Sequence, residues 1–387
     1  MKILILETRK LSYNSSNVFL LKICDILRKY GVDVVHCTIN NPEKDSDLLE
    51  SFIGKKFDAI LDINSILPLA ECEYGKYLDC IDAPFINFIV DHPMHVHEYL
   101  DIKLKRYYII CLDKYHKEYI DKYYPHIKKT AVVPLGGINS HSRWEDSFTQ
   151  FKKRRYHIFF PATYTPPSYY RQVMEEINVS YINLADQILQ RILEGSTSPI
   201  HEILKSITLW KDDHFAVKMY KARFIDRYIR DYIRDKVVQT LLLEGFALHV
   251  AGARWNMYNG HCKDRLIIHQ ECSYKNLPDI ISDSKVILNV QPLFTDTPHD
   301  RFFNAMLNGA AILTDTCGYI EKNYKNNTLL YSKDNLKESI DALKDTLNDI
   351  HKLYNIASNF SKNKNSETWE ERCRCIIKFV DDINNCG

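Results

Sequence analysis

The chain has 387 residues, of which 45% are hydrophobic and 26% charged. These proportions are ordinary for a globular protein and exclude a disordered, collagen-like or purely coiled-coil chain. Its 51 Lys and Arg residues nearly balance 50 Asp and Glu residues, and the resulting net charge of +1 gives no reason to expect nucleic acid or an anionic membrane as a partner.

The N-terminus and the cysteines indicate a cytoplasmic protein. No stretch reaches the ~20 consecutive apolar residues of a membrane helix, and the apolar run at the N-terminus is too short for a signal peptide. The 11 cysteines are odd in number and include no CxxC pair. We therefore expect no transmembrane segment, and reduced thiols that pack as small apolar groups rather than zinc ligands or a disulfide framework.

The first third of the chain alternates between strand and helix patterns. Residues 17–29 carry apolar side chains at helical spacing and stop before Gly31, a typical helix end. Because strands separated by helices indicate a parallel sheet, we expect residues 1–150 to form one doubly wound, Rossmann-like domain. Short apolar or β-branched runs predict its strands at residues 2–6, 32–39, 57–63, 84–90, 108–111 and 130–133.

A second alternating region follows a polar, basic stretch at residues 141–155, which we interpret as a linker. We expect a second Rossmann-like domain at 156–367, with a helical insertion at 169–243. A last helix within 368–387 could pack back on the first domain. Strands are predicted at 156–160, 247–251, 266–269, 285–290 and 310–314, and helices at 276–284, 301–307 and 336–350.

The predicted fold class is thus α/β, with two doubly wound domains. Open α/β sheets bind ligands beyond the carboxyl ends of their strands, so we expect the two domains to face a ligand-binding cleft. The common motifs of nucleotide-binding and hydrolytic enzymes are missing from the sequence. It contains no P-loop, no G-x-G-x-x-G, no G-x-S-x-G and no H-E-x-x-H, which argues against NTPases, NAD or FAD dehydrogenases, serine hydrolases and zinc peptidases.

The most informative stretch runs from Asn289 to Asp315 and predicts a strand, a loop, a helix, a glycine stop and a second strand. The helix begins near His299, Asp300 and Arg301. A helix start offers free N–H groups and the positive end of the helix dipole, and basic side chains beside it suit a diphosphate. The same residues also fit a solvated, charged helix start, so the residues alone leave both interpretations open.

This stretch resembles the donor-binding segment of GT-B glycosyltransferases, most closely their CgeB-like (spore maturation protein-like) branch. Four further segments resemble that family in the same order along the chain. The resemblance runs from residue 156 onward and covers the first domain only weakly. The four segments are residues 158–164, 248–255, 274–289 and 367–372.

The resemblance implies an enzyme that moves a sugar from a nucleotide-diphosphate sugar to an acceptor, a protein or a glycan. It also implies that no metal or other cofactor is needed, because a helix dipole and basic side chains would stabilise the departing diphosphate. Many retaining relatives hold the donor ribose with a Glu where this chain has Asn304, so we expect weaker ribose recognition there. The donor-binding residues implied are Thr163, Tyr164, Gly252, Arg254, Trp255, Gln270, Tyr274, His299, Asp300, Arg301 and Asn304. Trp255 also fits a core aromatic residue.

On the first domain, we expect acceptor-side chemistry where the strand 84–90 ends. A His beside an Asp can act as a general base near neutral pH, which favours His92 as the base with Asp91 orienting it. A turn before Pro93, stabilised by local hydrogen bonds, is the alternative. Tyr13 and Asn14 follow the first strand and are expected on the acceptor side.

Two other functions stay open at this point. A nucleotide-sugar epimerase on the same fold would need paired acid and base carboxylates, and no clear pair is visible in the sequence. A non-catalytic, GT-B-like nucleotide-binding adaptor is compatible with Asn304.

Overall fold

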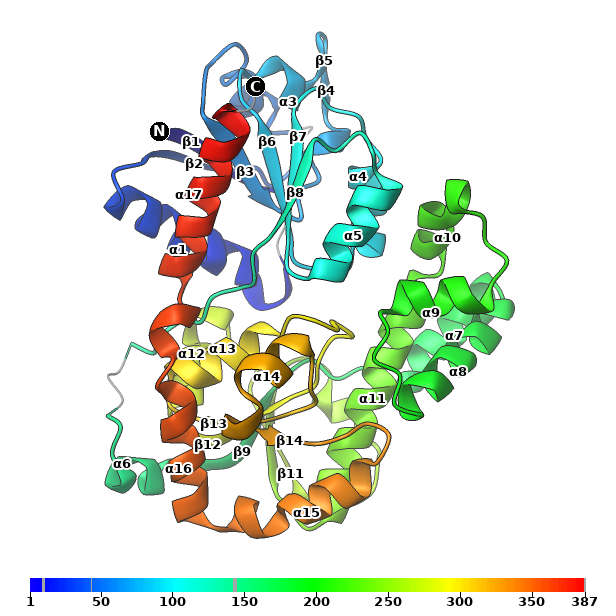
Figure 1. Ribbon diagram of the computed structural model, residues 1–387, viewed down its shortest axis with the longest axis vertical. Helices are drawn as coiled ribbons and strands as arrows, with labels where there is room; N and C mark the ends of the chain where they lie inside the picture. The colour runs from blue at the N-terminus through cyan, green and yellow to red at the C-terminus, as the bar shows by residue number, and fades with distance from the viewer. Residues whose placement is uncertain (9–10, 43, 142–144, 386–387) are drawn as a thin grey trace. The chain divides into compact units, whose positions relative to one another are not determined.

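The computed structural model describes residues 1–8, 11–42, 44–141 and 145–385, and these residues form two compact units (Figure 1). Unit 1 contains residues 1–135, 211–220 and 369–387, and unit 2 contains residues 136–210 and 221–368. Each unit is therefore built from segments that are far apart in the sequence. The predicted parallel α/β architecture of both halves is confirmed.

Unit 1 is built on a parallel sheet of six strands within the described residues, in the order β2-β1-β3-β6-β7-β8. Strands β3 and β6 are buried along their whole length, as expected of central strands covered on both faces. The strands are β1 (Lys2–Glu7), β2 (Asp33–Thr38), β3 (Ala59–Ile63), β6 (Phe85–Ile89), β7 (Tyr107–Cys111) and β8 (Lys129–Val132), and β4 (Glu71–Cys72) pairs with β5 (Gly75–Lys76) in a separate antiparallel hairpin. The helices are η1 (Ser12–Asn14), α1 (Ser15–Lys29), α2 (Ser46–Glu50), η2 (Leu67–Leu69), α3 (Tyr77–Cys80), η3 (Pro93–Val96), α4 (His97–Leu100), α5 (Lys114–Tyr123), η4 (Asp212–His214) and α17 (Trp369–Asn385).

Unit 2 carries a second parallel sheet, whose described strands follow the order β11-β10-β9-β12-β13-β14. The strands are β9 (Tyr156–Pro161), β10 (Leu248–Ala251), β11 (Leu266–His269), β12 (Ser284–Asn289), β13 (Ala311–Thr314) and β14 (Leu329–Leu330). The helices are α6 (Phe148–Lys153), α7 (Pro167–Ile177), α8 (Ser180–Leu193), α9 (Ile200–Ile207), α11 (Arg223–Leu243), η5 (Trp255–Met257), η6 (Lys263–Arg265), η7 (Tyr274–Asn276), α12 (Leu277–Ser282), α13 (Asp300–Leu307), α14 (Gly318–Asn323), η8 (Lys325–Asn327), α15 (Leu336–Asn348), α16 (Ile350–Ser361) and η9 (Lys364–Glu367), while α10 (Phe215–Lys221) ends at the boundary of the two units.

Two local predictions need correction. The stretch 141–155 is not simply a linker, because it contains α6, whose Phe148 ring stacks on His351 of α16 with 4.2 Å between centroids. The helix predicted at 336–350 is α15, which ends at Asn348, and a second helix, α16, begins at Ile350. The chain breaks between them at Asp349, whose carboxylate accepts hydrogen bonds from the backbone N–H groups of His351 and Lys352 and so caps α16.

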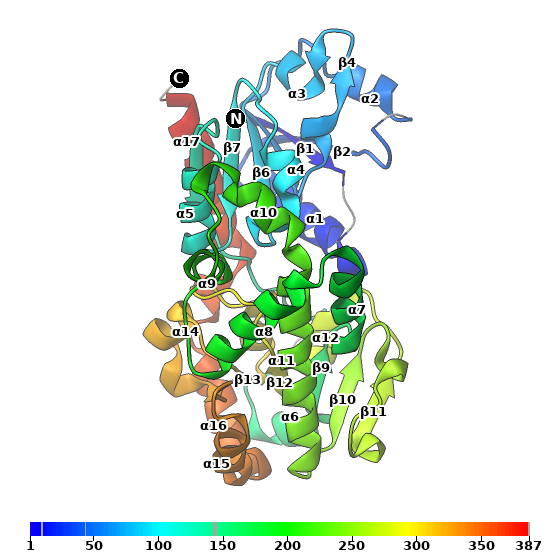
Figure 2. The ribbon, with the colours of Figure 1, turned by 90° about the vertical axis from the view of Figure 1, so that its right-hand side faces the viewer.

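The long helical region contributes to both units. In unit 2, α11 packs against α7 and α8, and Figure 2 shows the three helices side by side. Residues 211–220 instead belong to unit 1, where the Phe215 ring stacks on Tyr123 of α5 with 5.0 Å between centroids. The chain between β9 and β10 of unit 2 therefore includes a short segment, residues 211–220, that belongs to unit 1.

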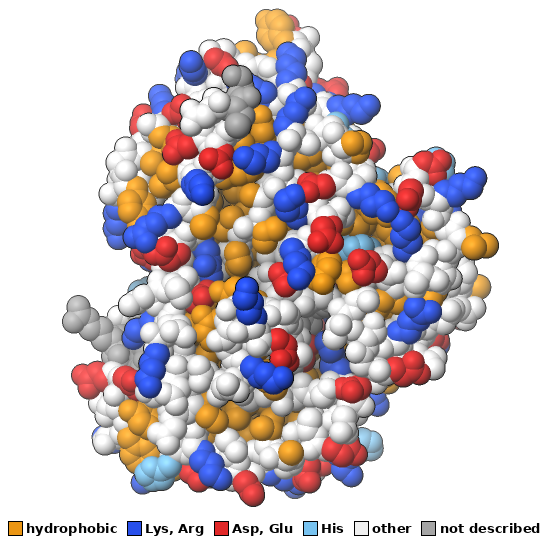
Figure 3. Space-filling view, viewed as in Figure 1, with side chains coloured by type: hydrophobic (Ala, Val, Ile, Leu, Met, Phe, Trp, Pro, Cys, Tyr) orange, Lys and Arg blue, Asp and Glu red, His pale blue; other side chains and the backbone are white. Residues whose placement is uncertain are grey.

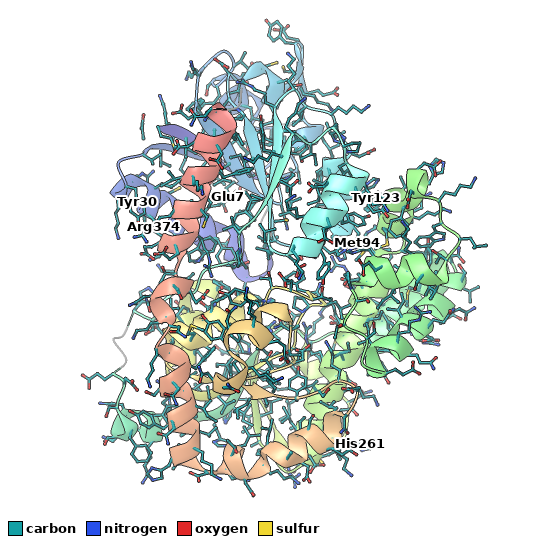
Figure 4. All side chains as sticks on the ribbon, in the orientation of Figure 1. Glu7, Tyr30, Met94, Tyr123, His261 and Arg374 are labelled. Carbon is teal, nitrogen blue, oxygen red and sulfur yellow. The ribbon has the colours of Figure 1, made fainter. Side chains whose placement is uncertain are left out.

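The C-terminal helix α17 belongs to unit 1. Its first residue, Trp369, lies with its ring centroid 5.2 Å from that of Phe19 on α1. Arg374 lies over the ring of Tyr30, just past the end of α1, at 5.7 Å from the centroid (Figure 4). In the described residues no helix is long and apolar enough to cross a membrane. On the face shown in Figure 3, Lys and Arg side chains are interspersed with Asp and Glu side chains.

Candidate functional site

The strand order of unit 2 points to one end of its sheet. The chain runs outward from β9 through β10 to β11 and then returns to place β12 on the other side of β9. Ligands of open α/β folds bind beyond the carboxyl ends of the strands at such a reversal of strand order. The site should therefore lie where β9 and β12 end, next to the loop that leads from Asn289 to α13.

Helix α13 begins in this region, as predicted, with His299 as its N-terminal capping residue. His299 Nδ1 contacts a carboxylate oxygen of Asp300, whose other oxygen accepts a hydrogen bond from the Tyr274 hydroxyl. Burial alone would raise the pKa of Asp300, but His299 and Arg301 together hold it below its usual range. Asp300 is therefore ionised near neutral pH and occupies part of the positive end of α13.

His299 is less suited than the sequence implied to supply positive charge. Burial and the nearby Arg301 guanidinium lower the pKa of His299, although Asp300 opposes the change. Its Nδ1 also accepts a hydrogen bond from the backbone N–H of Arg301 at 3.4 Å, which a doubly protonated imidazolium could not do. We therefore expect the positive charge of this site to come from arginines.

Arg301 is the buried cation of the site. Its side chain is 6% exposed, donates from Nη1 to Asn289 Oδ1 at 2.7 Å and lies over the Phe160 ring at 5.4 Å from the centroid. Burial lowers the pKa of Arg301 to about 10, and two further arginines add to the effect. The guanidinium stays charged at neutral pH and is held between the ends of β9 and β12.

Those two arginines, Arg230 and Arg234, come from α11 and were not predicted from the sequence. Arg234 donates to the carbonyl of Thr163 at 2.8 Å and to Asp231 at 3.1 Å, and it too lies over the Phe160 ring. Arg230 pairs with Asp226 at 3.5 Å. Both repel Arg301 enough to lower its pKa. A bound anion would relieve this repulsion.

Gln291, just past the end of β12, also points to a ligand. It is 3% exposed, its Oε1 accepts a hydrogen bond from the backbone N–H of His299 at 2.9 Å, and its own N–H donates to Asp315. Among the residues that the structure describes, none accepts a hydrogen bond from Gln291 Nε2. An unsatisfied buried donor costs about 1–3 kcal/mol, so a ligand oxygen beside the start of α13 would be stabilised there.

Several residues assigned to the donor by resemblance form the supporting wall of this site. Trp255 is 1% exposed, donates from Nε1 to the carbonyl of Ala162 and stacks on Tyr164, 5.1 Å between centroids. Tyr164 in turn donates to Asp235 at 2.9 Å. Burial and this carboxylate raise the pKa of Tyr164. Trp255 and Tyr164 therefore lie in the core, which was the alternative noted for Trp255.

Asn304 is buried, and both ends of its side-chain amide form hydrogen bonds within unit 2. It is 0% exposed, its Oδ1 accepts a hydrogen bond from the N–H of Ile138, and its Nδ2 donates to the Tyr274 hydroxyl, each at 2.8 Å. The same Tyr274 hydroxyl donates to Asp300. Asn304 and Tyr274 thus position the start of α13 from behind.

The remaining expected donor residues lie at the ends of β9, β10 and β11. Thr163 contributes its carbonyl to Arg234. Gly252 has a φ of 145°, which favours glycine. Arg254 is exposed and has a left-handed backbone with a φ of 68°, and Gln270 is exposed after β11. Their positions at strand ends match the prediction, while their contact with a donor stays a prediction.

Unit 1 has its own reversal of strand order, between β1 and β3. At the carboxyl ends of these strands, the Thr8 hydroxyl donates to Asp62, and Asp62 also accepts from the N–H of Ile63 at 2.7 Å. Thr8 lies 3.3 Å from the Ser65 hydroxyl. The preceding residue, Glu7 (Figure 4), is buried as well and accepts from Asn17 at 2.9 Å. A buried polar network therefore joins β1 to β3.

Burial raises the pKa of Asp62 to about 7, although hydrogen bonds from Ser65, Thr8 and Ile63 oppose the shift. Because the folded state holds this proton to a higher pH than the unfolded chain, Asp62 lowers stability as pH rises from about 4 to 7. Asp62→Asn should not show this loss. The difference in the free energy of unfolding between the variant and the parent should therefore increase in favour of the variant by about 3 kcal/mol from about pH 5 to pH 8. Urea unfolding of both proteins at the two pH values measures it, and a pH-independent difference would contradict it.

Asp91 lies one strand further along the same edge, just past β6, and is half-buried. Its Oδ2 accepts a hydrogen bond from Asn64 Nδ2 at 2.8 Å, and Asn64 Oδ1 accepts from the N–H of Val90 at 3.0 Å. Asn64 has a left-handed backbone with a φ of 47°, a strain that Asn tolerates better than most residues. Asn64 was not predicted, and it holds the Asp91 carboxylate in place.

His92 is buried, and its ring caps the short helix η3. Its ring is 6% exposed, accepts a hydrogen bond from the N–H of Met94 through Nδ1 at 3.1 Å and contacts the rings of His116 and Tyr119. A neutral imidazole that accepts at Nδ1 carries its proton on Nε2, so it lacks a second free lone pair. The geometry favours Asp91 over His92 as a base. The local capping turn that the sequence left open is present at His92.

Tyr13 and Asn14 directly precede α1. Both have left-handed backbones, with φ values of 58° and 60°, which is unusual for consecutive residues other than glycine. Asn14 is exposed and Tyr13 is half-buried. The structure thus places them at the carboxyl end of β1, and their contact with an acceptor stays a prediction.

Comparison with known proteins agrees with this arrangement. Residues 232–377 match a family model described as glycosyl transferase-like, a region that includes β10 to β14, α13 and most of α11. No curated protein matches the chain in sequence.

Similar solved structures span both units. They include sucrose-phosphate synthase from Thermosynechococcus elongatus (11% identity, TM-score 0.58, 100% of both chains). HepE from Anabaena in complex with UDP-glucose has 10% identity and a TM-score of 0.57 over 99% of this chain and 100% of that one. An alpha-glucosyltransferase in complex with UDP and a 13-mer DNA has 10% identity and a TM-score of 0.59, over 98% and 99%. The predicted GT-B fold is confirmed, and the family match together with this fold confirms the predicted enzyme class, glycosyltransferase.

Proposed function

We propose that this glycosyltransferase of GT-B fold transfers a sugar from a nucleoside-diphosphate sugar, bound on unit 2, to a hydroxyl-bearing acceptor, a protein or a glycan, recognised through unit 1. We also propose, from the sequence motifs, that it belongs to the CgeB-like branch and acts in the cytoplasm. Solved structures of the same fold contain UDP or UDP-glucose, so UDP-glucose is the first donor to test.

The observation that carries the proposal is the convergence of anion-binding groups at the switch point of unit 2. Arg230 and Arg234 lie close enough to Arg301 to lower its pKa, and the buried Gln291 Nε2 is unsatisfied within the described residues. Both features adjoin the positive end of α13. Such an arrangement suits a group with two adjacent phosphates.

The same groups would act in the reaction. When the bond between the sugar and the diphosphate breaks, negative charge grows on the departing nucleoside diphosphate. Guanidinium groups and helix N–H groups that are already in place stabilise that charge without reorganisation. Arg301 is fixed by Asn289 and Phe160, and Arg234 by Thr163 and Asp231, so both are preorganised.

The acceptor hydroxyl must lose a proton as it attacks the sugar. Asp91 is half-buried and its carboxylate is oriented by Asn64. We propose that it accepts this proton or orients the hydroxyl as a hydrogen-bond acceptor. Unit 2 thus binds the donor, and unit 1 supplies the group that acts on the acceptor.

The proposal is tested by incubating the protein with UDP-, GDP-, CDP- or dTDP-sugars, with and without protein, glycan and DNA acceptors. We expect one nucleoside diphosphate to be released with acceptor and far less without it. The arginines and α13 take the role that a divalent ion has in other sugar transferases, so we expect this release to persist in excess chelator.

Each other outcome has a distinct meaning. A sugar altered without acceptor would indicate an epimerase, and nucleotide binding with neither reaction would indicate an adaptor. Loss of activity in chelator, restored by manganese or magnesium, would contradict metal independence while leaving the transferase proposal intact.

A further inference from the structure

A pair of cysteines in unit 1 lies outside the site described above. Cys72 ends β4 and Cys80 ends α3, and their sulfur atoms are 3.7 Å apart. Both side chains are half-buried, so a small soluble thiol reagent can reach them. The two sulfurs are in van der Waals contact, and a disulfide requires them to approach to about 2.05 Å.

The backbone around the pair is fixed at several points. Cys72 pairs with Gly75 across the β4–β5 hairpin, and Gly75 has a φ of 111°, which a glycine adopts readily. The carbonyl of Cys80 accepts a hydrogen bond from the N–H of Gly54 at 2.9 Å, and the neighbouring Asp79 accepts from the N–H of Lys105 at 2.8 Å. The two sulfurs are therefore held together by the fold.

We propose that Cys72 and Cys80 form a reversible dithiol–disulfide site. Oxidation by a small disulfide such as oxidised glutathione proceeds by two exchanges. The thiolate of one cysteine attacks the oxidant, forms a mixed disulfide and releases one glutathione thiolate. The thiolate of the second cysteine then attacks the protein sulfur and releases the second glutathione. Two protein S–H groups are lost, one S–S bond is formed, and oxidised glutathione is reduced to two glutathione molecules.

The environment sets the rate of this exchange. Burial and the neighbouring Cys72 raise the pKa of Cys80, while Lys105 opposes the shift. Because only the thiolate reacts, exchange should speed up as pH rises toward 8 and beyond. The buried Cys24 and Cys373 should react more slowly, because burial raises the pKa of Cys24 to about 11 and that of Cys373 to about 12.

The bond would fasten the connection between two strands of the sheet. Residues 72–80 lie in the segment that leads from β3 to β6, and the disulfide would join the hairpin to α3 within it. A disulfide stabilises mainly by restricting the unfolded chain, and for a loop of roughly ten residues the midpoint of unfolding should rise by about 5 °C.

The experiment uses the full-length reduced protein in a buffer of oxidised and reduced glutathione at about pH 8. Free thiols are trapped by alkylation, and mass spectrometry of the peptides identifies the bonds. We expect the Cys72–Cys80 disulfide to exceed glutathione adducts of these two residues at least about tenfold, since the second exchange is intramolecular. The exposed Cys375 should form glutathione adducts under the same conditions and so reports that the oxidant was active.

Two variants separate the pair from general oxidation. In Cys72→Ser, Cys80 should carry glutathione instead, and the rise in the unfolding midpoint should vanish. In Cys375→Ser, both the Cys72–Cys80 bond and the rise should remain. The proposal is overturned if Cys375 is modified while Cys72 and Cys80 remain free, if they carry mainly glutathione, or if either is linked to another cysteine.

Discussion

Replacing Asp91 by Asn is expected to lower turnover by about 10²–10⁴-fold, the usual loss when a general base is removed. The expectation rests on the position of the carboxylate, which lies at the carboxyl edge of the unit 1 sheet, is half-buried and accepts a hydrogen bond from Asn64. Asn has the same shape and can still accept that hydrogen bond, but it cannot take a proton. Turnover and nucleotide affinity should be measured on the same preparations.

Nucleotide affinity should change by no more than a few fold in this variant. The groups that we assign to the diphosphate belong to unit 2, whereas Asp91 belongs to unit 1. A matched drop in affinity and turnover would instead indicate a structural role for Asp91.

His92→Asn is the matched control. Asn can replace the imidazole as the capping acceptor for the N–H of Met94, while the ring itself is lost. We expect turnover within a few fold of the parent. If this variant collapses and Asp91→Asn does not, the imidazole is the base, as the sequence alone had suggested.

Asn64→Gly tests how Asp91 is held. Glycine accepts the left-handed φ of 47° at this position without strain, so the backbone is kept while the hydrogen bond to Asp91 is lost. An intermediate loss of turnover, without loss of nucleotide affinity, is the result expected of a positioning residue.

Replacing Arg301 by Ala should weaken the binding of the nucleoside diphosphate by at least about tenfold, because a charge-assisted hydrogen bond contributes about 1.5–3 kcal/mol. Arg301 combines burial, fixed geometry and a pKa of about 10, so it is charged and preorganised at neutral pH. Isothermal calorimetry with the nucleoside diphosphate selected in the donor screen measures the loss. Unchanged affinity in a folded variant would place the diphosphate elsewhere.

Because Arg301 is buried, its removal could also disturb the fold, and a second variant keeps the test decisive. Arg230 has a side chain that is 25% exposed, so Arg230→Ala should fold and still weaken binding. Arg227 is exposed on the same helix, and Arg227→Ala is the matched control that should bind normally. If Arg230→Ala and Arg227→Ala weaken nucleotide binding equally, the effect comes from the overall charge of α11 and not from contact between Arg230 and the diphosphate.

His299→Ala separates charge from hydrogen bonding. The lowered pKa of His299 leads us to expect a smaller loss of affinity than for Arg301→Ala near neutral pH. As pH falls, the imidazole of the parent protein gains a proton and contributes positive charge to the site. The loss of affinity in His299→Ala should then approach the loss in Arg301→Ala. This pH dependence distinguishes a neutral histidine from one that is already charged.

The sequence by itself determined the elements and their class. Buried strands of parallel sheets are short apolar runs, and helices end at residues such as Gly31, whose φ of 78° is left-handed. These signals are local, so they predicted the strands of both sheets, except β14, to within a few residues. They also predicted the start of α13 near His299. The strands β4, β5 and β14 have only two residues each. They are too short to show the alternating pattern of a strand, and no prediction covered them.

The composition of the site was decided by the tertiary structure. The helical period of α11 showed which residues share a face, but no local signal shows that Arg230 and Arg234 lie beside Arg301, far along the chain. Burial is equally non-local. Trp255 and Asn304 occupy expected positions, yet stacking on Tyr164 and hydrogen bonds to Ile138 and Tyr274 commit them to the fold.

The same holds for the protonation states. The sequence favoured His92 because its ordinary pKa is near neutrality, but the availability of a lone pair depends on which groups surround the ring. The hydrogen bond from Met94 is a local cap at the start of η3, whereas the neighbouring rings of His116 and Tyr119 come from α5. In Asp62, burial alone moves a carboxylate into the neutral range. Sequence patterns show the spacing of hydrophobic residues and the positions of turns. The pKa of a side chain depends on its burial and on its distance from other charges, and both are set only when distant segments pack together.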